Sequence, residues 1–272
     1  LKMFVLNGIV DLLEGGVLNL LAIKRLEAIS RLLSENGSVD ASQLSEQFAV
    51  TPKTIRKDLD TLESMGLLDR VHGGAILKNG VNSLFPIERR KMQNLAEKQR
   101  IGAAALEYIE DGDTLILDGG STTIELARLL GEKNVLVVVS DLNIALELMN
   151  KSNINLFVAG GRLRREGSYT LVGRDTERML EKYQVKKVFL GTSALDLTTG
   201  LFVLNSDEAE VKKTMIAAAR EVICLVDYSK FHHTAFAPFC PIEKINTIIT
   251  DSRLPSEEQS YLQNQGIQVR VV

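Results

Sequence analysis

Several kinds of site are excluded because the sequence has too few of the residues that build them. It has only two cysteines, Cys224 and Cys240, which lie in separate segments, and only three histidines. No CxxC pair occurs, so a structural zinc site is excluded and two reduced cytosolic thiols are expected. No apolar run approaches the ~20 residues of a membrane-spanning helix. We therefore expect a cytoplasmic protein with no metal, no other cofactor and no membrane partner.

The sequence also lacks an excess of positive charge. Its 32 lysines and arginines are outnumbered by 35 aspartates and glutamates, and the formal net charge is −3. Any binding of nucleic acid must therefore come from a local basic surface. The composition, 45% hydrophobic and 25% charged, is ordinary for a soluble globular protein, and 272 residues suffice for one small and one medium domain.

The first third of the chain has the pattern of three short helices. Between residues 24 and 35 the apolar residues recur at helical spacing. Asp40 is suited to cap a second helix, and Thr51 is suited to cap a third helix that has Pro52 at its first position. Only a short turn separates the second helix from the third. This arrangement is typical of a helix-turn-helix.

Positive charge gathers on the outer face of the third predicted helix. Its inner stripe is Ile55, Leu59 and Leu62, which leaves polar side chains facing outward near its N-terminus. That end of a recognition helix meets base edges and phosphates. Residues 67–77 then predict two short strands with Gly73-Gly74 bending the second, a wing that touches phosphate or a minor groove. The predicted DNA-binding residues are Thr51, Lys53, Thr54, Arg56, Lys57, Arg70 and His72.

A basic helix face by itself is more often a solvated surface, but two motifs here occur together. They are Thr54-Ile55-Arg56-Lys57-Asp58-Leu59, continued by Leu62-Glu63 and Gly66, and Arg70-Val71-His72-Gly73-Gly74-Ala75. In both motifs the sequence resembles the DeoR family of bacterial transcriptional regulators. Family members usually have an arginine where this chain has Lys57, which keeps the charge but loses the bidentate geometry of a guanidinium. The resemblance implies a winged helix-turn-helix domain.

Residues 1–23 precede these motifs and allow two interpretations. They are apolar, but Asp11, Glu14 and several glycines interrupt them and no basic start is present, so a signal peptide is not expected. One interpretation is an extra helix that packs on the DNA-binding domain or on a partner subunit. The other is that Glu14-Gly15-Gly16 is encoded by a ribosome-binding sequence and that translation begins at a downstream leucine codon.

From about residue 100 onward, short apolar strands alternate with helical patterns. The predicted strands are 114–118, 136–139, 155–159, 187–190, 222–226 and 247–250. This alternation is typical of an α/β fold with a mostly parallel sheet, in which ligands lie beyond the carboxyl ends of the strands. We divide the chain into an extension (1–23), a winged helix-turn-helix domain (24–78), a linker (79–99) and an α/β effector-sensing domain (100–272). The basic run Arg89-Arg90 is interpreted as linker solubility, with a place near DNA as the alternative.

Glycines and polar residues follow several predicted strands. After the first strand, glycines let the backbone approach an anion, and hydroxyls and a helix N-terminus supply donors. An ordinary strand-to-helix turn is the alternative, and the nucleotide-binding pattern GxxxxGK[ST] is absent. Lysine suits a phosphate, whereas carboxylates suit sugar hydroxyls; an i,i+4 ion pair between Glu208 and Lys212 is a further expectation. The predicted effector-binding residues are Asp118, Gly119, Gly120, Ser121, Thr122, Thr123, Gly160, Gly161, Gly191, Glu208, Asp227 and Lys230.

This second half also carries motifs that resemble the DeoR family. They include the Gly-Ser-Thr-Thr loop at 120–123, Phe189-Leu190-Gly191 and Asp227-Tyr228-Ser229-Lys230. The resemblance implies a sensor domain similar in fold to ribose-5-phosphate isomerase and the CoA-transferases, which binds a phosphorylated sugar or related metabolite and so changes DNA affinity. Members often have Thr-Asn where this chain has Ser140-Asp141. An acid there disfavours a nearby phosphate, so Asp141 is not in the predicted effector set.

The expected function is that of a metabolite-controlled transcription factor, a repressor of a sugar or carbohydrate operon, and not an enzyme. Its expected partners are double-stranded operator DNA and a phosphorylated sugar. Two-fold symmetric operators further predict a homodimer or homotetramer. The alternative is a sugar-phosphate isomerase or acyl transferase on the same scaffold, because fold does not determine function. A DNA-architectural protein without a ligand would leave the glycine-rich strand ends without a role.

Overall fold

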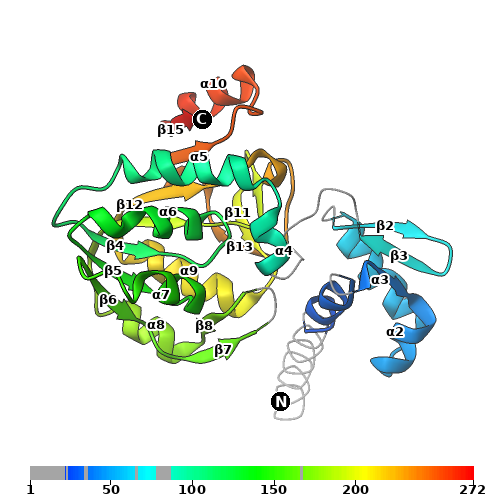
Figure 1. Cartoon of the computed structure of the whole chain (residues 1–272). Coiled ribbons are helices and arrows are strands. Elements are labelled where there is room, and N and C mark those ends of the chain that lie inside the picture. Colours follow the sequence, from blue (N-terminus) through cyan, green and yellow to red (C-terminus); the bar gives the residue numbers. More distant parts are fainter. Residues whose placement is uncertain (1–21, 23, 34–35, 65–66, 78–86, 166–167) are drawn as a thin grey trace, which may run out of the picture. The chain divides into compact units, whose positions relative to one another are not determined.

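The computed structural model describes residues 22, 24–33, 36–64, 67–77, 87–165 and 168–272. The two interpretations of the N-terminal extension concern residues that lie, with one exception, outside these ranges. The chain divides into two compact units, of which the first ends at Leu84 and the second begins at Phe85. Both are drawn in Figure 1. The second unit therefore includes 85–99, the larger part of the predicted linker.

The described residues of the first unit form three helical segments and a small antiparallel sheet, as the winged helix-turn-helix prediction requires. The sheet has the order β1-β3-β2, and its first strand was not predicted from the sequence. Asp40 caps the second helix as predicted, because its Oδ1 accepts hydrogen bonds from the N–H groups of Ser42 and Gln43 at 2.9 and 3.0 Å. The elements are the helical residues 24–33, β1 (Ser38–Asp40), α2 (Ala41–Gln47), α3 (Pro52–Ser64), β2 (Leu68–Val71) and β3 (Gly74–Leu77).

The second unit is built around a seven-stranded parallel sheet of order β15-β14-β12-β9-β4-β5-β6. All six strands predicted from the sequence are present, and β15 was missed. The strands are β4 (Thr114–Leu117), β5 (Val135–Val139), β6 (Ile154–Val158), β9 (Val185–Leu190), β12 (Ala219–Leu225), β14 (Thr247–Thr250) and β15 (Gln268–Val271). The helices are α4 (Ile87–Met92), α5 (Leu95–Leu106), α6 (Thr123–Leu129), α7 (Leu142–Leu148), α8 (Arg174–Leu180), α9 (Ser206–Ala217) and α10 (Ser256–Asn264), and η3 (Tyr228–Lys230) is a 3₁₀ turn.

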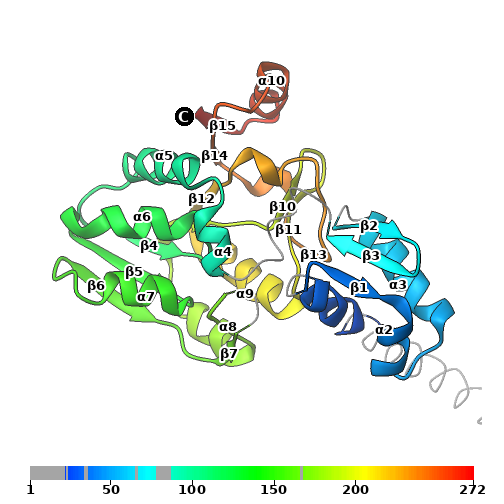
Figure 2. The ribbon, with the colours of Figure 1, turned by 45° about the vertical axis from the view of Figure 1, so that its right-hand side comes forward.

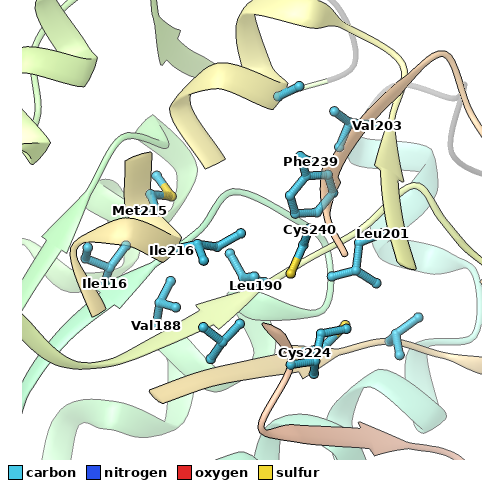
Figure 3. Close-up of a cluster of buried hydrophobic side chains, with 14 of the residues drawn as sticks. Ile116, Val188, Leu190, Leu201, Val203, Met215, Ile216, Cys224, Phe239 and Cys240 are labelled. Carbon is cyan, nitrogen blue, oxygen red and sulfur yellow. The ribbon is translucent and has the colours of Figure 1, made fainter. Parts of the chain in front are cut away.

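Alternating side chains of the central strands enter two separate cores, one on each face of the sheet. In β4, Leu115 and Leu117 pack with α5, α6 and α7, whereas Ile116 points into the core shared with α8 and α9. Figure 3 shows the second core, in which Ile116 and Val188 of the sheet lie near Met215 and Ile216 of α9. Because both faces are covered, these strands read as continuous apolar runs in the sequence.

Two small sheets extend the second core beyond the main sheet. One has the order β10-β11-β13, from β10 (Ala194–Asp196), β11 (Gly200–Val203) and β13 (Ala237–Cys240); the other pairs β7 (Arg162–Arg164) with β8 (Thr170–Val172). Their strands have only three or four residues each, so no periodic pattern distinguished them from loops. Since all seven strands of the main sheet are parallel, the loops that follow them emerge at one edge.

Candidate DNA-binding surface and effector site

Helix α3 presents its positive charge as the sequence predicted. Thr51 precedes it, and the Thr51 Oγ1 accepts a hydrogen bond from the N–H of Thr54 at 3.2 Å. Ile55, Leu59 and Leu62 are buried in the core of the unit. The opposite face is thereby turned outward: the side chains of Lys53, Arg56 and Lys57 are exposed and that of Thr54 is half-buried.

A buried ion pair fixes α3 to the first helix. Arg25 Nε donates to Asp58 Oδ2 at 2.6 Å and its Nη2 donates to Oδ1 at 3.1 Å, so that the guanidinium binds the carboxylate in a bidentate manner. The two side chains are 14% and 8% exposed. The hydrogen bond to Asp58 raises the pKa of Arg25. In the sequence, Asp58 was noted only as part of a motif. The structure shows that Asp58 binds Arg25 of the first helix and so orients the recognition helix α3.

The wing depends on two glycines and on one arginine. Gly73 has a φ of +81° in the hairpin turn, and a Cβ on Gly74 would lie 2.0 Å from the backbone oxygen of Val39 in β1. Arg70 faces α3: its guanidinium pairs with Asp60 and donates to the backbone oxygens of Gly74 and Arg56 at 3.3 and 3.4 Å. Arg70 therefore braces the wing against the recognition helix, while His72 lies exposed at the turn.

In the second unit, the carboxyl ends of neighbouring strands bring distant residues together. Asp118 follows β4, Gly191 follows β9 and Asp227 follows β12, and these three strands are adjacent in the sheet. The backbone N–H of Gly191 donates to Asp118 Oδ2 at 2.8 Å. A Cβ on Gly191 would lie 3.4 Å from the backbone oxygen of Gly119. The predicted loops therefore share one edge, and we call this region the effector edge.

The loop from Gly119 to Thr123 supplies hydrogen-bond donors to this edge. The five residues are buried, and Thr123 Oγ1 donates to the backbone oxygen of Gly120 at 2.9 Å. Within the described part of the chain, the N–H groups from Gly119 to Thr122 and the hydroxyls of Ser121 and Thr122 have no hydrogen-bond partner. A Cβ on Gly119 would lie 2.6 Å from Asp141 Oδ2 and 2.7 Å from Thr170 Cγ2, so a larger residue there would have to displace these two buried side chains. This loop is suited to a group that accepts several hydrogen bonds, such as a phosphate.

Asp118 belongs to a buried charge network rather than to the exposed part of the edge. It forms an ion pair with Lys212 of α9, and the two side chains are 4% and 1% exposed. Lys212 Nζ also donates to the backbone oxygen of Gly191 at 3.1 Å and lies 3.7 Å from Glu208 Oε1, as the predicted i,i+4 pair requires. Burial raises the pKa of Asp118 to about 6, against the opposing effect of the lysine. The network thus holds β4, β9 and α9 in fixed positions.

Glu208 is linked in turn to β7. It pairs with Arg164, and the side chains are 16% and 13% exposed. Burial would raise the pKa of Glu208, but the cations Arg164, Lys212 and Arg90 outweigh it, so the pKa is lowered and the carboxylate stays ionised. The glutamate lies among three cations that the sequence did not place together.

A second cluster surrounds Asp227. Its Oδ1 accepts hydrogen bonds from Asn94 Nδ2 at 2.9 Å and from Ser229 Oγ at 2.5 Å, and Asp227 is 1% exposed. Lys230 is half-buried, and its Nζ has no hydrogen-bond acceptor among the described residues. Burial lowers the pKa of Lys230 to about 8; the attraction of Asp227 opposes this shift, and repulsion by Arg90 and Lys98 contributes to it. A lysine held in this way is available to an anion.

Two of the predicted effector residues have different neighbours. Gly160 and Gly161 follow β6, which is the outermost strand, and both are exposed. Gly160 accepts a hydrogen bond from Thr176 Oγ1 at 2.8 Å, and its N–H contacts the sulfur of Met179 at 3.4 Å. Their described contacts are therefore with α8 and not with the loop at 119–123.

Sequence reasoning missed cations that the fold brings to the effector edge. Arg90 of α4, Lys98 of α5 and Arg164 of β7 all lie among the acids of this edge. Arg90 was interpreted as part of a soluble linker, because a local pattern does not show which distant carboxylates a side chain will approach. Asp141 has a local role that could have been found: it caps α7, accepting from the N–H of Asn143 at 2.8 Å.

Comparisons with known proteins agree with this arrangement. The family model described as the DeoR-like helix-turn-helix domain matches residues 25–80, and that of the DeoR C terminal sensor domain matches residues 93–252. The chain therefore belongs to the DeoR family of transcriptional regulators, and it is a regulator and not an enzyme.

Three curated relatives have similar length. The glycerol-3-phosphate regulon repressor of Escherichia coli (strain K12) is 33% identical, with 91% of this chain and 98% of that protein aligned. The transcriptional regulator GlpR of Haloferax volcanii is 33% identical over 92% and 98% of the two chains, and IolR of Bacillus subtilis is 31% identical over 92% and 99%. Ribose 5-phosphate isomerase A of Methanocaldococcus jannaschii is 23% identical, covering 51% of this chain and 55% of that one at a TM-score of 0.38, which is too low to support a functional comparison.

Neither a metal site nor a membrane span is found in the described ranges. No group of three or more histidine, cysteine, aspartate or glutamate side chains there is placed to hold a metal ion. No described helix combines the length and the apolar character needed to cross a membrane.

Proposed function

We propose that this protein represses an operon of sugar or carbohydrate metabolism and that a phosphorylated sugar bound at the effector edge controls it. The observation that carries the proposal is the loop from Gly119 to Thr122: its residues are buried, its N–H and hydroxyl donors have no partner among the described residues, and it lies at the sheet edge where Lys230 follows β12. The phosphate would bind these donors and the lysine, and Glu208 or Asp227 would accept hydrogen bonds from sugar hydroxyls. The similarity to the glycerol-3-phosphate regulon repressor of Escherichia coli supports a role in carbohydrate metabolism.

The same proposal assigns Lys53, Thr54, Arg56 and Lys57 to operator DNA, with Thr51 at the helix start and with help from Arg70 and His72. A homodimer or homotetramer would present two such helices to a two-fold symmetric operator. The effector would act by binding more tightly to one arrangement of the DNA-binding units, and a coupling free energy of ~1–3 kcal/mol is typical of such control.

The effector is tested by thermal shift with a panel of phosphorylated sugars, including glycerol 3-phosphate and ribose 5-phosphate. A compound that binds the folded chain raises its melting temperature by mass action. The unphosphorylated sugars serve as controls, because the proposal requires that they have little effect. If the unphosphorylated sugars raise the melting temperature as much as the phosphorylated ones do, the phosphate assignment is wrong.

Replacing Ser121 and Thr122 together by alanine is expected to weaken binding of the best phosphorylated sugar by roughly tenfold or more, because two hydrogen bonds to a charged group are lost. Operator binding without the sugar should be unchanged. Both quantities can be measured by titration calorimetry and by gel shift on an operator selected from random DNA. Ser260→Ala, an exposed serine in α10, is the matched control; equal sugar affinity in the double variant and in this control refutes the loop assignment.

Arg56→Ala is expected to weaken operator binding by ~1–3 kcal/mol and to relax the preference for one base pair, if the guanidinium binds a base edge. Lys57→Ala should instead weaken binding to all sequences alike and reduce the slope of affinity against salt by about one ion, because lysine contacts phosphate. Gel shifts at several salt concentrations separate the two effects. Unchanged affinity and unchanged preference in Arg56→Ala would remove this residue from the interface.

A further inference from the structure

The recognition helix α3 carries two exposed acids on the C-terminal side of its cations. They are Asp60 and Glu63, which follow Lys57 along the helix. Negative charge beside a DNA-binding surface repels phosphate, so these acids would weaken DNA binding if they faced only solvent. Figure 2 shows the wing strands β2 and β3 near this helix, and β2 contacts it. Both acids are bound by the wing.

Asp60 binds the wing through a side chain. Its carboxylate pairs with the guanidinium of Arg70 in β2. Arg70 Nη1 also donates to the backbone oxygen of Arg56 at 3.4 Å, and its Nε donates to that of Gly74 at 3.3 Å. The side chain of Arg70 therefore joins the recognition helix to both strands of the wing. Its charge is balanced by a carboxylate, which reduces its attraction for the phosphates of DNA.

Glu63 binds the backbone of the same wing residue. Its Oε1 accepts a hydrogen bond from the N–H of Arg70 at 3.0 Å. In the sheet order β1-β3-β2 this strand is outermost, so Glu63 supplies an acceptor from α3 on the side that has no neighbouring strand. The helix thus holds both the main chain and the side chain of Arg70. His72, which lies exposed two residues further on, takes its position relative to α3 from these contacts.

We propose that Asp60 and Glu63 are positioning residues for DNA binding, two acids that increase the affinity for DNA because they fix the wing to the recognition helix. Arg70 acts through this connection and not as a ligand of phosphate, which leaves His72 as the wing residue that meets the DNA. The inference rests on the proposed function and specifies how Arg70 contributes to operator binding. Removing a negative charge near DNA ordinarily strengthens binding, whereas removing either of these two acids weakens it.

Gel shifts with the full chain test this on a duplex that the wild-type protein selects from random DNA. Asp60→Ala and Glu63→Ala are each expected to weaken binding roughly three- to tenfold, as the loss of an ion pair or of a hydrogen bond to a charged group implies. Asp60→Glu should restore part of the affinity, because it restores a carboxylate. Asp69→Ala is the matched control: it removes an exposed acid from the strand that carries Arg70, and it should bind at least as tightly as the wild type.

The dependence of affinity on salt distinguishes a positioning residue from a phosphate ligand. Arg70→Gln should weaken binding and leave the slope of log affinity against log salt unchanged, whereas Lys57→Ala should reduce that slope by about one. Arg70→Gln combined with Asp60→Ala should bind no more weakly than Arg70→Gln alone, because both changes break the same contact. Melting temperatures should change little, since exposed ion pairs contribute little to stability.

Two results would overturn the inference and leave DNA binding by α3 standing. One is that Asp60→Ala and Glu63→Ala bind DNA as tightly as the wild type or more tightly. The other is a salt slope reduced by about one in Arg70→Gln, which would make this residue a phosphate ligand. If Asp60→Ala lowers the melting temperature, Asp60→Asn, which keeps the size of the side chain, decides the outcome. A wild-type chain that selects no duplex from random DNA contradicts the proposed function and, with it, this inference.

Discussion

Lys212→Met is expected to lower the free energy of unfolding of the second unit by about 3–5 kcal/mol, because it leaves Asp118 buried without its cation. Lys212 is the only partner that supplies Asp118 with a full positive charge among the described ion pairs, and both side chains are almost completely enclosed. Methionine keeps the length and the apolar stem of the side chain. Urea unfolding followed by tyrosine fluorescence reports on this unit alone, since all five tyrosines lie in it.

The loss should depend on pH in a defined direction. Burial already raises the pKa of Asp118 to about 6, and removing Lys212 raises it further. A carboxyl group with a raised pKa in the folded state contributes stability at low pH that is lost as the pH rises through that pKa. The deficit of the variant should therefore be larger at pH 8 than at pH 6.

Two further variants test the cause of this loss. Lys212→Met combined with Asp118→Asn should recover most of the stability, because Asp118 is then no longer a buried charge without its cation, and Glu208 keeps its pair with Arg164. Lys213→Met, in which the neighbouring exposed lysine loses its pair with Glu210, should change stability by less than about 0.5 kcal/mol. A deficit below ~1 kcal/mol that is equal at pH 6 and pH 8 would contradict the role given to the pair.

Gly74→Ala is expected to abolish most operator binding, by more than roughly a hundredfold, because it separates the wing from β1. The added Cβ would lie 2.0 Å from the Val39 backbone oxygen. Because this neighbour is a backbone atom, no flexible side chain can move away to relieve the clash. Overpacking of this kind typically costs 1–3 kcal/mol of stability. It would also shift Arg70, which bonds to the Gly74 oxygen and braces the wing against α3. The measurement is a gel shift together with thermal unfolding followed by circular dichroism.

Ile76→Ala is the control for this prediction, since Ile76 lies in the same strand and is 43% exposed. It should leave operator affinity within a few-fold of the wild type. If Gly74→Ala and Ile76→Ala bind operator DNA equally well, the geometry of the wing does not control binding.

Much of the fold could be predicted from local signals. The helix-turn-helix followed from caps such as Asp40 and Thr51 and from the buried stripe of α3, because these depend on residues a few positions apart. The central strands followed from their continuous apolar runs. Strands β1, β10 and β11 were missed because three or four residues carry no period, and β1 exists only where Gly74 lets two backbones approach.

For the candidate site too, residues in local motifs could be predicted from the sequence, whereas residues that act on distant parts of the chain could not. The sequence identified the loop 119–123 and the group Asp227 to Lys230, since each is a compact motif at the end of a strand. It did not identify Arg90 or Lys98, whose charges act on carboxylates more than 40 residues away along the chain: Arg90 on Asp141 and Glu208, and Lys98 on Asp227. The roles of individual DNA-binding and effector-binding residues remain predictions, which the variants above test.

The sequence by itself determined the family, the two-unit organisation and the residues of the recognition helix, because motifs and periodicity are local properties of the chain. Only the tertiary structure decided that Asp118 is held by Lys212, that Arg70 braces the wing, and that Arg90 belongs to the effector edge. Parallel strands place the ends of β4, β9 and β12 side by side whatever their separation in sequence. Electrostatic interactions depend on those distances and on burial, and neither can be read from the order of the residues.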